Sequence, residues 1–372
     1  GRHEIKIGAV GYYAPVSEAL QYRITDATYF DPGTPPDFTF SDRRLDREQA
    51  GFAQDTVRLG NLTLSAGLRF DHYSLVVNGH AWSPRLAAAW YWPKADLLLR
   101  GSYDRAFITP AMENLLLASS PRVDSLNPLV LRIPLRPSTG NFLEGGVSKG
   151  LFGKARLDAG YYRRSFVNFA DDDVFLNTGI SFPVAFRSAQ VRGLDVKLAM
   201  PHWGRFSGFL SYSNMIGVAQ LPVAGGLFLG RDALGAIGAA GSFPITQDQR
   251  NTARARLRCQ LHPRLWAAAV ATYGSGLPVE INGNPDIGAL VSEYGQGITS
   301  RINFSAGRVR PNYSVDASLG ADLWKREKRA LRLQAVVENV MNRLNVVDFA
   351  GLFSGTAIAP PRSGNVRIQY EF

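Results

Sequence analysis

The sequence predicts an all-β fold, an antiparallel transmembrane β-barrel, and three observations support it. Segments of about ten residues alternate apolar and polar side chains, which is the pattern of strands with one lipid face and one wet face. These segments are joined by connections that alternate between short and long. The chain also ends on such a segment, 365–372, whose Val366, Ile368, Tyr370 and Phe372 share one face. In a soluble protein that terminal apolar face would invite aggregation, whereas lipid covers it in a barrel.

About fourteen strands follow from this alternation. In the segment around 62–71, Leu64 and Leu68 lie on one face and Arg69 and Asp71 on the other. The predicted strands are 2–13, 48–59, 61–74, 83–93, 96–107, 139–150, 154–168, 184–200, 204–216, 247–260, 264–276, 311–324, 329–341 and 362–372.

The connections fall into two classes, as in outer-membrane barrels with periplasmic turns and extracellular loops. Short turns are predicted at 59–61, 93–96, 151–153, 201–204, 261–264 and 325–328. Longer loops are predicted at 14–47, 75–82, 108–138, 169–183, 217–246, 277–310 and 342–361. The loop 108–138 is rich in leucine, so we expect it to fold inward or to pack on its neighbours.

Composition excludes several functional classes. The chain has 372 residues, a net charge of +10 and one cysteine, Cys259, so no intrachain disulfide forms. No apolar run approaches the ~18–20 residues of a spanning helix. The basic residues are scattered along strands, which argues against nucleic-acid binding. No histidine pair has metal-binding spacing and no nucleophile–base grouping is present, so we expect neither a metal, a cofactor nor an enzyme.

Candidate ligand residues lie in the lumen and in one loop. Arg254, Arg256 and Arg258 alternate along one strand face, and a row of charges there must point inward because lipid would not tolerate it. We expect Asp316 and Asp322, or acidic groups of a segment outside residues 1–372, to balance these charges. Polar and aromatic side chains of the loop 277–310 suit a hydrophilic ligand, with the candidates Asn282, Asp286 and Tyr294.

Aromatic side chains near the predicted strand ends are expected to form the girdles that mark the membrane interfaces. They are Tyr13, Trp90, Trp92, Tyr161, Trp266, Trp324, Tyr370 and Phe372.

Several short motifs, in order and over nearly the whole chain, resemble the barrel of TonB-dependent outer-membrane receptors. Two of them, Asp248-Gln-Arg-Asn-Thr and Tyr273-Gly-Ser-Gly-Leu-Pro-Val, are most similar to receptors with an N-terminal carboxypeptidase-regulatory-like domain. The remaining motifs occupy 67–73, 83–87, 101–115, 191–196, 337–343 and 369–372.

The resemblance implies a location in the bacterial outer membrane and a barrel of about 22 strands with a plugged lumen. Residues 1–372 would then be the C-terminal part of the barrel, with the plug and about eight strands preceding them. The plug would contact the TonB complex, and Tyr370 and Phe372 would be read by the barrel-assembly machinery.

The implied function is active uptake of a scarce ligand. Siderophore, cobalamin, carbohydrate and peptide all remain open as that ligand. A passive porin-like channel and an adhesin or assembly scaffold are the alternatives.

Overall fold

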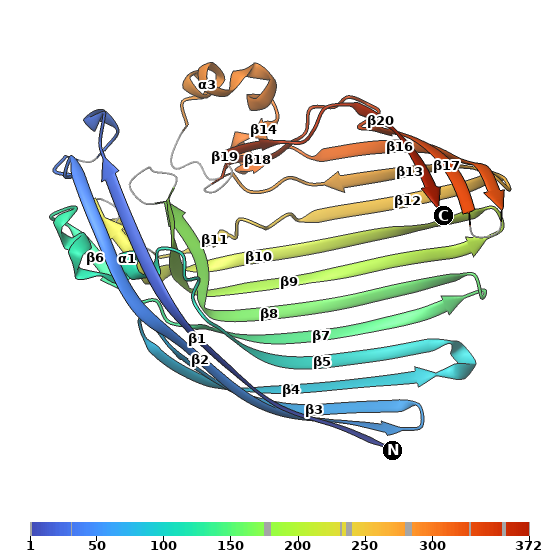
Figure 1. Cartoon of the computed structure of the whole chain (residues 1–372), viewed down its shortest axis with the longest axis horizontal. Coiled ribbons are helices and arrows are strands. Elements are labelled where there is room, and N and C mark those ends of the chain that lie inside the picture. The colour runs from blue at the N-terminus through green and yellow to red at the C-terminus, as the bar shows by residue number, and fades with distance from the viewer. Residues whose placement is uncertain are drawn as a thin grey trace.

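The computed structural model describes residues 2–30, 32–174, 180–230, 233–235, 240–279, 285–326, 329–351 and 355–371. Fourteen strands follow one another in a single antiparallel path, and each pairs with its sequence neighbour in that path (Figure 1). They are β1 His3–Arg23, β2 Asp37–Leu59, β3 Leu62–Ser74, β4 Asn78–Trp92, β5 Leu97–Ile108, β7 Ser138–Leu151, β8 Ala155–Val174, β9 Ser181–Trp203, β10 Phe206–Leu229, β12 Asn251–His262, β13 Leu265–Gly274, β16 Asn312–Arg326, β17 Arg329–Glu338 and β20 Ser363–Glu371. The predicted number and order of strands are confirmed.

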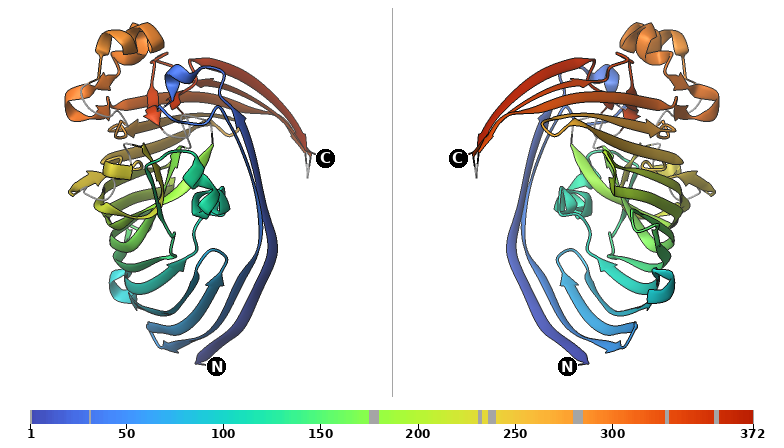
Figure 2. Two further views of the ribbon diagram at one scale, coloured as in Figure 1. Left: turned by 90° about the vertical axis from the view of Figure 1, so that its left-hand side faces the viewer. Right: turned by 90° about the vertical axis from the view of Figure 1, so that its right-hand side faces the viewer.

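The sheet is strongly curved, and its two edges are β1 and β20 (Figure 2). Among the described residues these two edge strands are not paired with each other. Within the same residues no helix is long and apolar enough to cross a membrane. The connections at one end of the sheet, here called the turn end, are all short. At the other end, here called the loop end, the connections are longer, except for the short connection 75–77 between β3 and β4 (Figure 1).

The convex, outer face carries the apolar side chains. Ile5 and Ile7 on β1 are 67% and 79% exposed, and Val366 and Ile368 on β20 are 69% and 70% exposed. Apolar side chains that are this exposed on the outer face of a strand are typical of barrel strands that contact lipid. An exception is Asp55, which shares this face with Val57 and pairs with His3 at 2.7 Å near the turn end.

The concave, inner face is polar and carries ion pairs. Arg69 bonds Asp71 at 2.7 Å, and Arg332 bonds Asp322 at 3.2 Å. Residues that lie directly opposite each other on neighbouring strands point to the same side of the sheet. The strand register therefore shows that these ion pairs lie on the same face. The alternation read from the sequence therefore separates a lipid face from a lumen face as predicted.

Several strands extend further than predicted at the loop end. The segment 14–47 was expected to be a loop, but β1 continues to Arg23 and β2 begins at Asp37, so 14–23 and 37–47 are strand. Similarly, β9, β10 and β8 take up much of 169–183 and 217–246. For β1, β2, β9 and β10 the physical reason is that apolar side chains of another loop cover the inner faces of the extensions, which the local sequence does not reveal.

That loop, residues 109–137, is called the inner loop. It contains α1 Leu115–Ser119, a 3-10 turn η3 Pro121–Ser125, and β6 Val130–Ile133, which pairs with β10. Leu116, Leu117 and Leu126 are buried among Phe40 of β2 and Leu227 of β10. Figure 2 shows α1 on the concave side of the sheet. The prediction that this leucine-rich loop folds inward is confirmed.

Two of the remaining long connections, β13 to β16 and β17 to β20, build a second compact unit at the loop end, called the loop subdomain. It comprises α3 Ile287–Thr299, β14 Ile302–Asn303, the 3-10 turn η4 Phe304–Ala306, β15 Arg308–Val309, β18 Val346–Gly351 and β19 Gly355–Ile358. Its core is formed by Ile302, Val309, Val346 and Phe349. Smaller elements elsewhere are the 3-10 turns η1 Ala27–Tyr29 and η2 Pro93–Ala95, and β11 Ser242–Pro244.

Candidate functional site

The lumen surface of β12 carries the predicted arginine row, Arg254, Arg256 and Arg258. Arg254 lies opposite Ser211 of β10, which lies opposite Lys197 of β9, so the row shares the polar inner face. Arg254 and Arg256 are exposed on this face. Arg258 is half-buried, and its guanidinium lies 4.5 Å from the ring centroid of Trp266.

Trp266 therefore corrects one prediction. It was expected in an outer aromatic girdle, but its register with Gln260 and Gly320 places it on the inner face. A cation held over an aromatic ring is stabilised by the ring's quadrupole, so Trp266 orients Arg258 in the lumen. Trp324 and Tyr370, by contrast, stack on each other with 6.4 Å between ring centroids, and Tyr370 shares the outer face with Ile368.

The two carboxylates proposed as partners of the arginine row do lie on the inner face, but the structure gives them other partners. Asp316 accepts hydrogen bonds from the Asn339 backbone N–H at 2.8 Å and from Ser314 Oγ at 3.2 Å. Asp322 pairs with Arg332 of β17. Within the described residues neither carboxylate forms an ion pair with Arg254, Arg256 or Arg258.

Two of the three loop candidates, Asp286 and Tyr294, have structural roles in the loop subdomain. Asp286 is the N-cap of α3, where its carboxylate accepts from the backbone N–H groups of Gly288 and Ala289. The Tyr294 ring packs edge-on against Phe349 with 5.0 Å between centroids, and burial raises the pKa of its phenol. Asn282 lies outside the described residues, as does Phe372 at the end of the chain.

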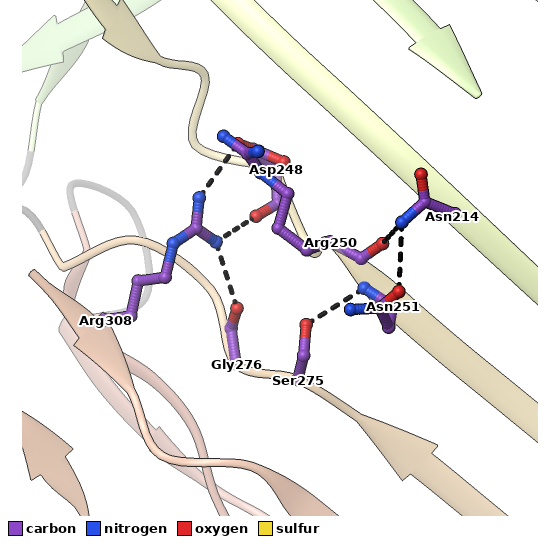
Figure 3. A network of polar contacts seen from close by, with 7 residues as sticks. All are labelled: Asn214, Asp248, Arg250, Asn251, Ser275, Gly276 and Arg308. Atoms are coloured by element: carbon purple, nitrogen blue, oxygen red, sulfur yellow. Dashed lines mark hydrogen bonds and ion pairs between the residues drawn. The ribbon is translucent and has the colours of Figure 1, made fainter. Parts of the chain in front are cut away.

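A polar network at the loop end holds the loop subdomain to the sheet (Figure 3). Asp248 is fully buried, and its Oδ2 accepts from Arg250 Nε and Arg308 Nη2, both at 2.9 Å. Arg308 also donates to the backbone oxygens of Asp248 at 2.6 Å and Gly276 at 3.3 Å. A buried carboxylate between two guanidiniums with several hydrogen bonds fixes the path of the chain.

The same network extends into β10 and β12. Asn214 donates to Arg250 O and to Asn251 Oδ1, both at 2.9 Å, and the Asn251 backbone N–H donates to Ser275 Oγ at 2.9 Å (Figure 3). These contacts join the segments 248–252 and 273–279, which stood out in the sequence as family-like motifs. The segments 248–252 and 273–279 therefore attach the loop subdomain to the sheet, and together they are called the clasp.

The inner loop is held to opposite walls of the sheet. On one side, Glu18 of β1 accepts from the backbone N–H groups of Leu116 at 3.0 Å and Leu117 at 2.9 Å. Arg122 donates to Ser41 O of β2 at 2.9 Å. On the other side, Asn114 donates to Ser181 O of β9 at 2.6 Å, and β6 pairs with β10. The inner loop thus forms a bridge across the concave side between β1–β2 and β9–β10 (Figure 2).

The geometry defines one wall of a membrane barrel with a polar lumen that a loop crosses. A family model described as "TonB dependent receptor-like, beta-barrel" matches residues 2–340. The chain therefore belongs to the TonB-dependent receptor β-barrel family, and it is an outer-membrane β-barrel chain.

Several solved structures have the same fold. The chain is similar to the outer membrane transporter YddB from Escherichia coli, with 13% identity and a TM-score of 0.66, over 100% of this chain and 52% of that one. It is also similar to the copper transporter OprC, with 12% identity and a TM-score of 0.67, over 100% of this chain and 55% of that one. A third similar structure is the ferripyoverdine receptor of Pseudomonas aeruginosa, with 12% identity and a TM-score of 0.65, over 100% of this chain and 46% of that one.

The chain thus spans about half the length of the solved structures that it resembles. A search of curated proteins gave no match to the sequence.

Proposed function

We propose that this chain is part of the barrel of an outer-membrane receptor that actively takes up a scarce ligand. Uptake would be driven through the TonB complex, contacted by a plug, as the family implies. The main supporting observation is the inner loop, which crosses the concave side and is held at both walls by hydrogen bonds. A bridge of this kind suits a gated passage better than a passive pore.

Within this proposal the arginine row has two candidate roles. It can hold the plug and order lumen water, or it can guide an anionic ligand along β12. The second role gains support from the exposure of Arg254 and Arg256, which have no hydrogen-bond or ion-pair partner for their side chains within the described residues. The ligand itself stays open, although iron-siderophore and copper complexes are reasonable first probes because similar proteins carry those names.

The test uses cells that produce the full-length receptor and cells that lack it. Accumulation of radiolabelled ferric-siderophore and copper complexes is measured with and without a protonophore. We expect receptor-dependent accumulation that the protonophore abolishes. Accumulation that persists without proton-motive force would favour the passive channel, and a receptor that binds no small ligand would favour the adhesin or scaffold.

The role of the arginine row is tested with R254Q/R256Q/R258Q in the same cells. We expect either leakage of large molecules or weaker, salt-sensitive uptake, because exposed charges act over about 10 Å at 0.1 M salt. The matched control is R2Q/R205Q/R264Q, which removes three exposed arginines outside the row. Intact sealing together with unchanged, salt-insensitive uptake would remove both roles.

A further inference from the structure

Three arginines meet where the loop subdomain joins the sheet, and they are called the arginine cluster: Arg301, Arg310 and Arg343. Arg301 follows α3, and Arg310 follows β15. The Arg310 backbone N–H donates to Arg301 O at 2.7 Å, which makes these two residues cross-strand neighbours at the open end of the β14–β15 hairpin. Arg343 comes from the segment after β17.

Two of the guanidiniums converge on a single oxygen. The backbone oxygen of Pro311 accepts from Arg301 Nη2 at 3.0 Å and from Arg343 Nη2 at 3.2 Å. The Arg343 guanidinium also lies 3.8 Å from the centroid of the Tyr313 ring, which fixes its plane. Arg310 Nε donates to Ile302 O at 3.4 Å. The positive charges are thus held close together by neutral groups.

Among the described residues the cluster has no acidic partner. Within the described ranges none of the three guanidiniums forms an ion pair, although thirteen other ion pairs are present there. The Nε atoms of Arg301 and Arg343 are buried and have no hydrogen-bond partner. Burial lowers the pKa of the Arg301 guanidinium, and the nearby charges of Arg343 and Arg310 lower it further.

We propose that the arginine cluster is a binding site for an oxyanion of the phosphate class. Guanidinium groups bind phosphate oxygens through paired N–H donors, and an anion would relieve the repulsion among three like charges. The site is open to a ligand because Arg310 is exposed and the other two side chains are half-buried. The proposal is independent of the ligand that the receptor takes up.

The phosphate group has two candidate sources, a soluble anion and a lipid headgroup. The lipid source is considered because Val340, Met341 and Leu344 lie beside Arg343 in sequence and are 39%, 57% and 38% exposed. Both sources present the same oxygens to the cluster, so the experiment contains one arm for each.

The test uses the full-length receptor in detergent micelles. One arm titrates inorganic phosphate by calorimetry, and the other compares phosphatidic acid with phosphatidylcholine in mixed micelles by native mass spectrometry. The variant R301Q/R310Q/R343Q is expected to bind phosphate groups at least tenfold more weakly than the unmodified receptor. The control R23Q/R43Q/R136Q removes three exposed loop-end arginines and is expected to stay within about twofold.

The two arms distinguish the sources. Phosphatidic acid bound at least tenfold more tightly than inorganic phosphate indicates a lipid headgroup, and comparable binding indicates a soluble anion. If the triple variant does not fold, as judged by its heat-modifiable band, R310Q alone is used, with an expected loss of at least threefold. Failure of the unmodified receptor to bind either probe, an unaffected R310Q, or an equal loss in the control would overturn the proposal.

Discussion

Two adjacent positions of β16, Leu319 and Ser318, test the assignment of the two faces most sharply. Leu319 is the eighth of fifteen residues in the strand, so it lies near the middle of the span. It is 49% exposed on the outer face, opposite Ala267 of β13 and Ala335 of β17. Ser318 points inward, opposite Ala268 and Val336.

Arginine at these two positions should have very different costs. At Leu319 the guanidinium would face lipid near the midplane, which costs about 2–4 kcal/mol of folding free energy. At Ser318 it would enter the aqueous lumen on the same strand face as Asp316 and Asp322, so we expect almost no cost. The difference corresponds to about 30- to 700-fold in the folding equilibrium, since each 1.4 kcal/mol is a factor of ten.

The assay measures folding of the full-length receptor into lipid vesicles over a urea series, with the heat-modifiable band as the signal for the folded barrel. A second pair, L333R and Q334R on β17, repeats the comparison, because Leu333 lies opposite Ile368 and Gln334 lies opposite Arg367. Equal losses for the outer and inner variants in both pairs would refute the register and the assignment of lipid and lumen faces.

Three further predictions concern the inner loop, the clasp and the chain end. E18A should destabilise the attachment of the inner loop by about 2–3 kcal/mol, because it removes a charged acceptor from two backbone N–H groups. Hydrogen exchange of the amides at 116–117 should therefore become faster, whereas the control E4A, on the same strand face, should leave it unchanged. D248N should cost about 3 kcal/mol in the clasp and expose 285–310 to proteolysis, whereas D286N, which keeps an N-cap acceptor, should not; equal cleavage in the two would contradict the clasp. Deleting Phe372 should reduce assembled receptor far more than the outer-face change F70L, and unchanged membrane-embedded protein after the deletion would reject the assembly signal.

The strands were predictable because one physical requirement governs each of them. A span with lipid on one side and water on the other must alternate, and charges such as Arg254 and Arg256 can point only inward. β13 shows where this logic fails. Its two faces are both apolar: the outer face carries Ala267, Ala269 and Ala271, and the inner face carries Trp266, Ala268 and Val270. The sequence of this strand therefore does not indicate which face contacts lipid. The inward position of Trp266 could be assigned only from the register of β13 with β12 and β16.

The loops were less predictable because their side chains serve contacts between segments distant in sequence. Asp286 and Tyr294 have the composition of a ligand site, yet the first caps α3 and the second packs on Phe349. The leucines of the inner loop did signal burial, but not their position against β2 and β10. The extension of β1 to Arg23 depends on that cover and could not be predicted from local alternation.

The conductance of the full-length receptor in a planar lipid bilayer tests most directly whether this barrel wall belongs to a gated receptor or to an open pore. Because the inner loop is held to both walls of the sheet, we predict only baseline leakage from the unmodified receptor, without stable open steps. A steady, ohmic conductance of the size expected for an unobstructed porin-like channel would contradict the account.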